Sequence, residues 1–268
     1  MMRIHFVDVG QGNMVVVVFP DNTTLVYDCN ITSNNSDRVE KYLAEIMPKQ
    51  GIDVFVNSHR DADHMRGLAW LHSKYPIGTI WDSGVPGNQD APEYQTYMRV
   101  KRRTEIASYE IEQGQTWSNE TVRILNGKRG VDDTNSQSIV LQLKYQSLSV
   151  MLAGDTDAAV WRNSIVPSFG ESLNSVVLYA SHHGSDSFFD DPNGYGPYTE
   201  HMEKISPQLA VVSVGKNSFG HPDREAMSIY DQKALGADDG TKLLRTDEVG
   251  SMTLDLMDGG RWQLSKER

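Results

Sequence analysis

The chain has 268 residues, of which 38% are hydrophobic and 23% are charged, as in an ordinary folded protein large enough for one sizeable domain. Its 36 Asp and Glu residues outnumber its 25 Lys and Arg residues, and the formal net charge is -11. This balance argues against a wide basic surface of the kind that binds duplex DNA non-specifically, but it allows a local basic groove.

The single cysteine, Cys29, excludes an internal disulfide, which fits a reducing compartment. No apolar segment long enough for a signal peptide follows Arg3, and the longest apolar run, from Met14 to Phe19, is too short to span a bilayer. We therefore predict a cytoplasmic protein without a membrane partner, folded as a single domain over residues 1–268.

The first part of the chain predicts a β-meander followed by a helix. Alternating apolar residues predict strands over residues 3–8, 14–19 and 24–27. The glycine-rich turn after the first strand lacks the Lys-Ser/Thr pair of a phosphate-binding loop and leads into a strand, which excludes that motif. A helix is predicted over residues 36–47, with Ser36 as its N-cap and a proline after its end.

The central motif of the sequence is Ser-His-Arg-Asp-Ala-Asp-His at residues 58–64. A buried strand is predicted before it, over residues 54–56, and an amphipathic helix after it, from Met65 to about Tyr75. The turn between them carries four potential metal ligands: His59, Asp61, Asp63 and His64. Imidazole and carboxylate groups together suit zinc, manganese or iron. The alternative is a polar turn in which an aspartate only caps the following helix.

A third helix, predicted over residues 93–107, holds the tight basic cluster Arg99, Lys101, Arg102 and Arg103. In an acidic protein this cluster has two interpretations. It is either a solvated helix face or a set of phosphate contacts beside an active site, where basic groups raise affinity without reading sequence.

Three later strands lead into polar segments. The strand predicted over residues 149–152 leads into Gly154-Asp155, and the strand over residues 176–180 leads into a Ser-His-His-Gly-Ser segment. The strand over residues 209–214 leads into Gly-Lys-Asn-Ser-Phe-Gly-His-Pro, whose proline is predicted to start a helix over residues 223–234. Taken singly, a Gly-Asp pair or two turn histidines are weak signals. Their order along the chain makes them specific.

In that order, the motifs resemble those of the metallo-β-lactamase fold. Asp61 stands where most of that superfamily has histidine, and together with the opening Phe-Val-Asp-Val-Gly-Gln-Gly this resembles one branch, the metallohydrolase domain of ComEC-type competence proteins and their stand-alone relatives. Asn13 departs from the aspartate usual there. No histidine lies between His72 and His182, so one ligand usual in the superfamily is missing, as it is in that branch.

The resemblance implies an α/β fold, an αββα sandwich of two mixed β-sheets with helices on the outer faces and metals at one edge. It implies two divalent metal ions, zinc or manganese, and the extra carboxylate of Asp61 favours manganese. By the family match, one ion is held by Asp63, His64, His182 and a bridging Asp155. The other is held by His59, Asp61 and Asp155. Asp28 resembles an acidic residue near the metals, or is an ordinary turn residue.

The function implied is hydrolysis by a metal-activated water, with DNA as the preferred phosphodiester substrate. The predicted catalytic residues are Asp63, His183 and His221, where His183 either supports a ligand or contacts substrate. The predicted substrate-binding residues are Lys216, Asn217 and Ser185. Two alternatives stay open: a hydrolase of small substrates such as cyclic nucleotides, phosphoesters or lactones, and a metal-binding partner protein with little activity. The oligomeric state is left open.

Overall fold

A computed structural model describes residues 1–128, 133–191, 194 and 196–268. One sheet contains β1 (Met2–Phe6), β2 (Val15–Val18), β3 (Thr24–Tyr27), β4 (Ile52–Val56), β5 (Ile77–Asp82), β6 (Ala107–Glu110), β14 (Met252–Met257) and β15 (Arg261–Lys266). The other contains β7 (Thr116–Trp117), β8 (Val122–Asn126), β9 (Val140–Tyr145), β10 (Leu148–Leu152), β11 (Val177–Tyr179), β12 (Leu209–Val212) and β13 (Leu243–Arg245).

The helices are α1 (Ser36–Ile46), α2 (Ala62–Met65), α3 (Leu68–Lys74), α4 (Pro92–Lys101), α5 (Ala158–Val160), α6 (Val166–Phe169), α7 (Glu200–Ile205), α8 (Arg224–Lys233) and α9 (Thr246–Val249). A π-helical turn, η2 (Trp161–Ile165), joins α5 to α6, and short 3₁₀ turns are η1 (Asn135–Gln137), η3 (Gly170–Leu173), η4 (Ser181–Gly184) and η5 (Asp186–Phe188). Of the helices in the described part of the chain, none has the length and apolar character needed to span a bilayer.

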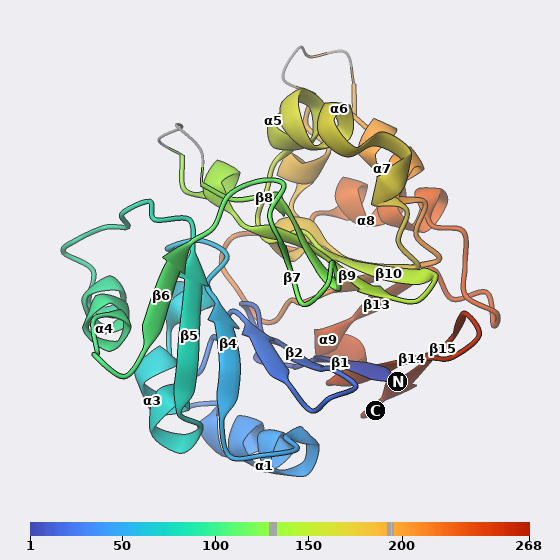
Figure 1. The fold of residues 1–268 in the computed structure, drawn as a ribbon. Helices are drawn as coiled ribbons and strands as arrows, with labels where there is room; N and C mark the ends of the chain where they lie inside the picture. The colour runs from blue at the N-terminus through green and yellow to red at the C-terminus, as the bar shows by residue number, and fades with distance from the viewer. Residues whose placement is uncertain (129–132, 192–193, 195) are drawn as a thin grey trace.

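The two sheets lie face to face between two layers of helices (Figure 1). The strand order is β15-β14-β1-β2-β3-β4-β5-β6 in one sheet and β13-β12-β11-β10-β9-β8-β7 in the other, and each sheet contains both parallel and antiparallel pairs. Helices α1, α3 and α4 cover the first sheet, and α5 to α8 cover the second (Figure 1). This confirms the αββα sandwich expected from the resemblance.

Side-chain alternation along the strands builds the layers. In β1, Met2, Ile4 and Phe6 are buried in the core between the sheets, where the Phe6 ring stacks on Tyr179 of β11 at 5.3 Å between centroids. Successive residues of a strand point to opposite faces, so the neighbouring positions supply the outer cores. In β4, for example, Val54 faces the other sheet while Phe55 packs under the covering helices.

Parallel pairing gathers the polar segments at one edge. Strands β3, β4 and β5 run parallel in one sheet, and β10, β11, β12 and β13 run parallel in the other. Parallel strands end at the same edge of a sheet, so the segments that follow them are neighbours. The motif at residues 58–64 follows β4, and Asp155, the two histidines and the loop at residues 215–222 follow β10, β11 and β12.

The helix predicted from Met65 to Tyr75 is interrupted. Helix α2 ends at Met65 and α3 begins at Leu68, because Gly67 has a left-handed φ of 97°. A Cβ atom at Gly67 would lie 2.5 Å from the Cβ of Ile31. The close approach lets the Arg66 carbonyl accept a 2.8 Å hydrogen bond from the Ile31 amide, which ties the motif to the segment after β3.

The helix predicted over residues 93–107 is too long. Helix α4 ends at Lys101, and Ala107 begins β6, a strand that pairs parallel to β5 and that the sequence patterns missed. The Lys101 ammonium lies 2.7 Å from the carboxylate of buried Asp82, whereas the three neighbouring arginines are exposed. The basic cluster is therefore divided between one internal ion pair and a solvated face.

Two helix starts also differ from the prediction. Asn35 and not Ser36 occupies the N-cap position of α1. Asp223 caps α8 by accepting hydrogen bonds from the amides of Glu225 and Ala226, so Pro222 lies before the helix instead of in its first turn.

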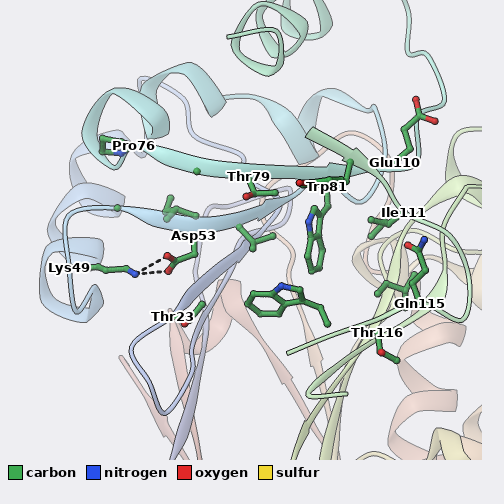
Figure 2. Close-up of a pocket in the computed structure, with 17 residues that line it drawn as sticks. Thr23, Lys49, Asp53, Pro76, Thr79, Trp81, Glu110, Ile111, Gln115 and Thr116 are labelled. Atoms are coloured by element: carbon green, nitrogen blue, oxygen red, sulfur yellow. Dashed lines mark hydrogen bonds and ion pairs between the residues drawn. The ribbon is translucent and has the colours of Figure 1, made fainter. Parts of the chain in front are cut away.

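A cavity of about 1200 Å³ opens between the sheets, between β5 and β6 on one side and β7 and β8 on the other. Trp81 and Trp117 meet there edge to face at 5.5 Å between centroids. Figure 2 shows Trp81 at this cavity and the paired Lys49 and Asp53 at its side. Its lining includes none of the predicted metal or substrate residues, so this cavity is separate from the strand ends that carry them.

Replacing Gly67 with Ala tests the break between α2 and α3. We expect the Gly67→Ala variant to lose about 2–4 kcal/mol of unfolding free energy, because strain at positive φ adds to a contact with Ile31. The matched control is Gly114→Ala, since Gly114 also has positive φ but no atom within 4 Å of its built Cβ, and should cost only about 1–2 kcal/mol. Urea unfolding at equal m-values measures both, and equal losses would contradict the role assigned to the contact.

Candidate metal centre

The segments after β4 and β10 meet at Asp155. The Nε2 atom of His64 lies 3.2 Å from Asp155 Oδ2, and the Nε2 atom of His59 lies 3.7 Å from the same oxygen. All three side chains are buried, and their ligand atoms lie within 4.8 Å of one another. A histidine pair from one sheet and a carboxylate from the other therefore form a first group that could hold a metal ion.

A second group shares His64 and contains Asp63 and His183. The Nε2 atom of His183 lies 3.3 Å from Asp63 Oδ2 and 3.9 Å from Asp155 Oδ2, and His64 Nε2 lies 3.9 Å from Asp63 Oδ1. The ligand atoms of Asp63, His64 and His183 also lie within 4.8 Å of one another. Asp155 thus lies between the two groups, as a bridging carboxylate would.

The ligand atoms of these groups are buried without hydrogen-bond partners. They are His59 Nε2, His64 Nε2, His183 Nε2 and Asp155 Oδ1. A buried polar atom without a partner normally costs free energy, so four of them within one cluster of side chains require an explanation. Imidazole nitrogens and a carboxylate oxygen are the donor set of zinc, iron and manganese sites. The residues present therefore fit the divalent metals that the fold implies.

Hydrogen bonds behind the cluster fix the orientation of two of the histidines. Fully buried Asp28 accepts from the amide and hydroxyl of Ser58, at 2.7 Å each, and lies 2.8 Å from His64 Nδ1. Because the Ser58 hydroxyl donates to Asp28, it can accept from His59 Nδ1 at 3.0 Å. Both rings then carry their proton on Nδ1 and turn Nε2 toward the cluster. This is the support that metal-ligating histidines usually have.

The two adjacent histidines after β11 have different surroundings. His182 and His183 both adopt left-handed backbone conformations, with φ of 48° and 54°. His183 is buried and donates from Nδ1 to the carbonyl of Ser213 at 2.9 Å, so its Nε2 faces Asp63. His182 is a quarter exposed and lies 3.7 Å from Asp155, next to the ring of His221. The sequence assigned the ligand role to His182, whereas the geometry brings His183 to the Asp63 group.

The electrostatics of the cluster favour cations. Burial alone would raise the pKa of Asp155, but the surrounding histidines, His64 foremost, hold it well below its usual range. Burial would also raise the pKa of Asp63, but the neighbouring histidines, His64 foremost, lower it. Burial would lower the pKa of His64, but Asp155 and Asp28 raise it well above its ordinary value. The carboxylates stay charged, and a bound cation would compete with the proton on His64.

The remaining member of the motif, Asp61, lies at the solvent side. Its side chain is half exposed, and its Oδ2 is 3.7 Å from His59 Nε2. The nearby His59 lowers the pKa of Asp61 against the opposing effect of burial. The ligand group around His59 is therefore more open than the group around Asp63.

The predicted substrate-binding residues differ in how far their side chains are already engaged in hydrogen bonds. The amide of Asn217 accepts from the backbone N–H of Phe219, Gly220 and His221, and donates to the carbonyls of Gly215 and His221. These bonds leave the predicted phosphate contact of Asn217 without support.

Ser185 is likewise engaged in its own turn. Its hydroxyl accepts from the Ser187 amide at 3.2 Å and donates to Asp186 at 3.3 Å. Lys216, by contrast, is exposed and makes no ion pair with any residue in the described ranges. Of the three predicted substrate-binding residues, Lys216 alone keeps its functional group free among the described contacts.

Sequence reasoning missed several supporting residues. Arg60, inside the central motif, is buried and pairs at 2.8 Å with Asp82 at the end of β5, under the rings of Tyr94 and Tyr97. Asp82 ends an apolar strand, and the predicted metal ligands also stand at strand ends. That position is the sequence feature that could have pointed to Asp82. The backbone carbonyl of Ser213 carries no sequence signal at all.

Comparisons with known proteins identify the family of the chain. The sequence model of the Metallo-beta-lactamase superfamily matches residues 7–160, more than half of the chain. Competence protein ComA of Neisseria gonorrhoeae is 29% identical over 256 residues, covering 94% of this chain and 32% of that protein. ComE operon protein 3 of Bacillus subtilis (strain 168) is 21% identical over 270 residues, covering 93% of this chain and 32% of that protein. The chain spans about a third of the length of these relatives.

A similar solved structure is that of Tm1679, described as a metal-dependent hydrolase of the β-lactamase superfamily. Its TM-score is 0.59 at 15% identity, covering 96% of this chain and 100% of Tm1679, which shows a shared fold. The family match, the sandwich and the His/Asp cluster lead to one conclusion. This chain belongs to the metallo-β-lactamase superfamily, as a relative of the ComEC-type competence proteins.

Proposed function

We propose that this metallo-β-lactamase-fold hydrolase is a phosphodiesterase that cleaves DNA with the help of two divalent metal ions. The observation that carries the proposal is the set of buried, unpartnered ligand atoms around Asp155. The resemblance to ComEC-type domains, whose relatives are associated with nuclease activity, supports the choice of substrate.

In this proposal, Asp63, His64, His183 and Asp155 hold one ion, and His59, Asp61 and Asp155 hold the other. Bound divalent ions supply Lewis-acid stabilisation and a water nucleophile at near-neutral pH. The chain's part is to fix the ligands, and the hydrogen bonds that His64 donates to Asp28 and His183 donates to the Ser213 carbonyl do so without an ion. The choice between zinc and manganese is governed by the carboxylates, and Asp61 favours manganese.

His182 and His221 form the solvent side of the site, with ring centroids 5.1 Å apart. Burial lowers the pKa of both rings, and for His221 the neighbouring histidines lower it further. Both imidazoles are therefore neutral at neutral pH. A neutral ring is a weak acid, so we assign His221 the donation of a hydrogen bond to a phosphoryl oxygen instead of a proton to the leaving group.

A second candidate is hydrolysis of a small phosphodiester. The net charge of -11 favours a substrate with few phosphates over a long duplex. Salt dependence separates the two substrates, because affinity for a polyanion falls steeply with salt and affinity for a small ester does not.

Cleavage of linear single- and double-stranded DNA with added manganese or zinc tests the proposal directly. We expect metal-dependent cleavage by the wild-type protein and a loss of at least about a hundredfold in Asp155→Ala, because the shared carboxylate is removed from both groups. The control is Asp239→Ala, which removes an exposed loop carboxylate and should cleave as the wild type does. If the metal-loaded protein cleaves neither single- nor double-stranded DNA, the DNA assignment is wrong. The remaining possibilities are then a hydrolase of small phosphoesters or lactones, or a non-catalytic metal-binding protein.

The ligand assignment predicts different defects for the two adjacent histidines. The variant His183→Ala should lose the ion held with Asp63, because its Nε2 lies 3.3 Å from that carboxylate. The variant His182→Ala should keep the wild-type metal content and lose turnover. Metal content after dialysis, measured by plasma emission spectrometry, distinguishes them. Loss of metal from His182→Ala with full retention in His183→Ala would restore the assignment made from sequence.

Replacing Asp28 with Asn tests the orientation of His64. The amide is isosteric and tolerates the left-handed φ of 59° at this position, so the fold should persist. An amide N–H facing His64 Nδ1 would favour the tautomer with its proton on Nε2, and we expect metal affinity to fall about 10–100-fold. Calorimetric metal titration measures the loss, and Asp21→Asn, in an exposed turn, is the control. Unchanged affinity in Asp28→Asn would show that Asp28 is only structural.

A further inference from the structure

Phe219 is an apolar side chain held in water beside the candidate metal centre. It is 71% exposed, more than any other large hydrophobic residue in the described part of the chain. Leaving a phenylalanine ring in solvent forgoes the free energy that burial would supply. A single exposed apolar side chain is ordinary on a protein surface, so the interest of Phe219 lies in its position beside the candidate metal centre.

A row of rings joins Phe219 to the ligands. The Phe219 ring lies nearly parallel to that of His221, with centroids 6.2 Å apart and an interplanar angle of 22°. His221 lies 5.1 Å from His182, whose Nε2 is 3.7 Å from Asp155. The Phe219 ring is therefore connected through His221 to His182, and His182 lies beside Asp155, the candidate bridging carboxylate.

The loop that carries Phe219 is internally fixed. The side-chain oxygen of Asn217 accepts from the amides of Phe219, Gly220 and His221 at 2.9, 3.1 and 3.2 Å, and its nitrogen donates to two carbonyls of the same loop. A side chain with five local hydrogen bonds holds the backbone in one shape. A pre-shaped loop loses little conformational entropy on binding, which is how a recognition surface gains affinity.

The base of the loop is attached to the strands. The amide and carbonyl of Val214 are both hydrogen-bonded to the hydroxyl of Thr246. At Gly215 the backbone approaches the turn after β1 so closely that a Cβ would lie 2.5 Å from the Gly10 carbonyl carbon. The position of Phe219 relative to the metal ligands is therefore set by the sandwich itself.

The chemistry of the loop matches one class of partner. Lys216 is exposed and has no ion-pair partner among the described residues. It supplies a cation three positions before Phe219 in the same loop. A flat apolar ring binds the face of a nucleobase, and a nearby cation binds phosphate. In a duplex the base faces are covered by their neighbours, so only an unpaired base offers its face to such a ring.

We propose that Phe219 is a stacking platform for an unpaired nucleobase next to the scissile phosphodiester, so that the substrate is single-stranded nucleic acid. This inference rests on the proposed phosphodiesterase function and narrows it. Lys216 contributes charge without base preference, and His221 connects the platform to the ligands.

The test compares two single-stranded phosphorothioate oligonucleotides of equal length, one with bases and one abasic throughout, on the manganese-loaded protein. The backbone resists cleavage, so fluorescence anisotropy reports binding alone. We expect the wild type to bind the base-containing strand about tenfold more tightly, as one stacked base would give. The variants Phe219→Ala and Phe219→Leu should lose this preference, and Phe219→Trp should keep it.

Two controls separate stacking from charge and from general loss of aromatic surface. Tyr109→Ala removes a 57% exposed ring on β6 of the other sheet and should keep the preference. Lys216→Gln should weaken binding of both strands equally and reduce the salt dependence of affinity.

The outcomes distinguish this inference from the proposed function. If the wild type cleaves DNA but shows no preference for bases, or if Phe219→Ala and Phe219→Leu keep that preference, the stacking platform is wrong and the phosphodiesterase stands. If the wild type neither cleaves DNA nor binds either strand, both proposals fail. A base preference that disappears in Phe219→Ala supports the stacking platform, even if the wild type does not cleave DNA. In that case the protein would act on unpaired strands by another reaction.

Discussion

The geometry of the candidate metal centre depends on one buried carboxylate. Asp28 is fully enclosed, and its charge is balanced by hydrogen bonds with Ser58 and His64. A buried charge is tolerable only when it is paired in this way. The pairing fixes the His64 ring directly and the His59 ring through the Ser58 hydroxyl, so a single residue at the end of β3 aims two ligand nitrogens at Asp155.

The second constraint is the packing of the two sheets. Asp155 belongs to one sheet and His64 to the other, and their atoms meet at 3.2 Å only because the apolar core holds the sheets at a fixed separation. Near the site, Tyr27 donates to the carbonyl of Ile139 at 2.6 Å, and the Ser213 hydroxyl donates to the Gly12 carbonyl at 2.7 Å. These bonds cross between the sheets, so folding stability and ligand geometry are coupled.

The charge distribution of the molecule makes the candidate site negatively charged. An acidic molecule gathers several carboxylates around histidines at one edge, and the low pKa of Asp155 keeps a negative charge there that favours a cation. Of the basic cluster at residues 99–103, Lys101 is used in an ion pair with Asp82, whereas the three arginines are exposed to solvent. In the function proposed above, recognition of a substrate depends on bound metals, a free lysine and an exposed ring.

The sequence by itself determined most of the strands, the order of the motifs and the residue types of the candidate ligands, because local alternation and spacing encode strands and the segments that follow them. The sandwich followed from the resemblance of those motifs to the metallo-β-lactamase fold. Tertiary structure decided which atoms meet. Two neighbouring histidines with similar backbone angles have different contacts, because the Nδ1 of His183 is bound by the Ser213 carbonyl, thirty positions away, and that of His182 by the Ser187 hydroxyl. The break at Gly67 depends on contact with Ile31. Such long-range contacts leave no periodic trace in a sequence, so patterns alone could not predict them.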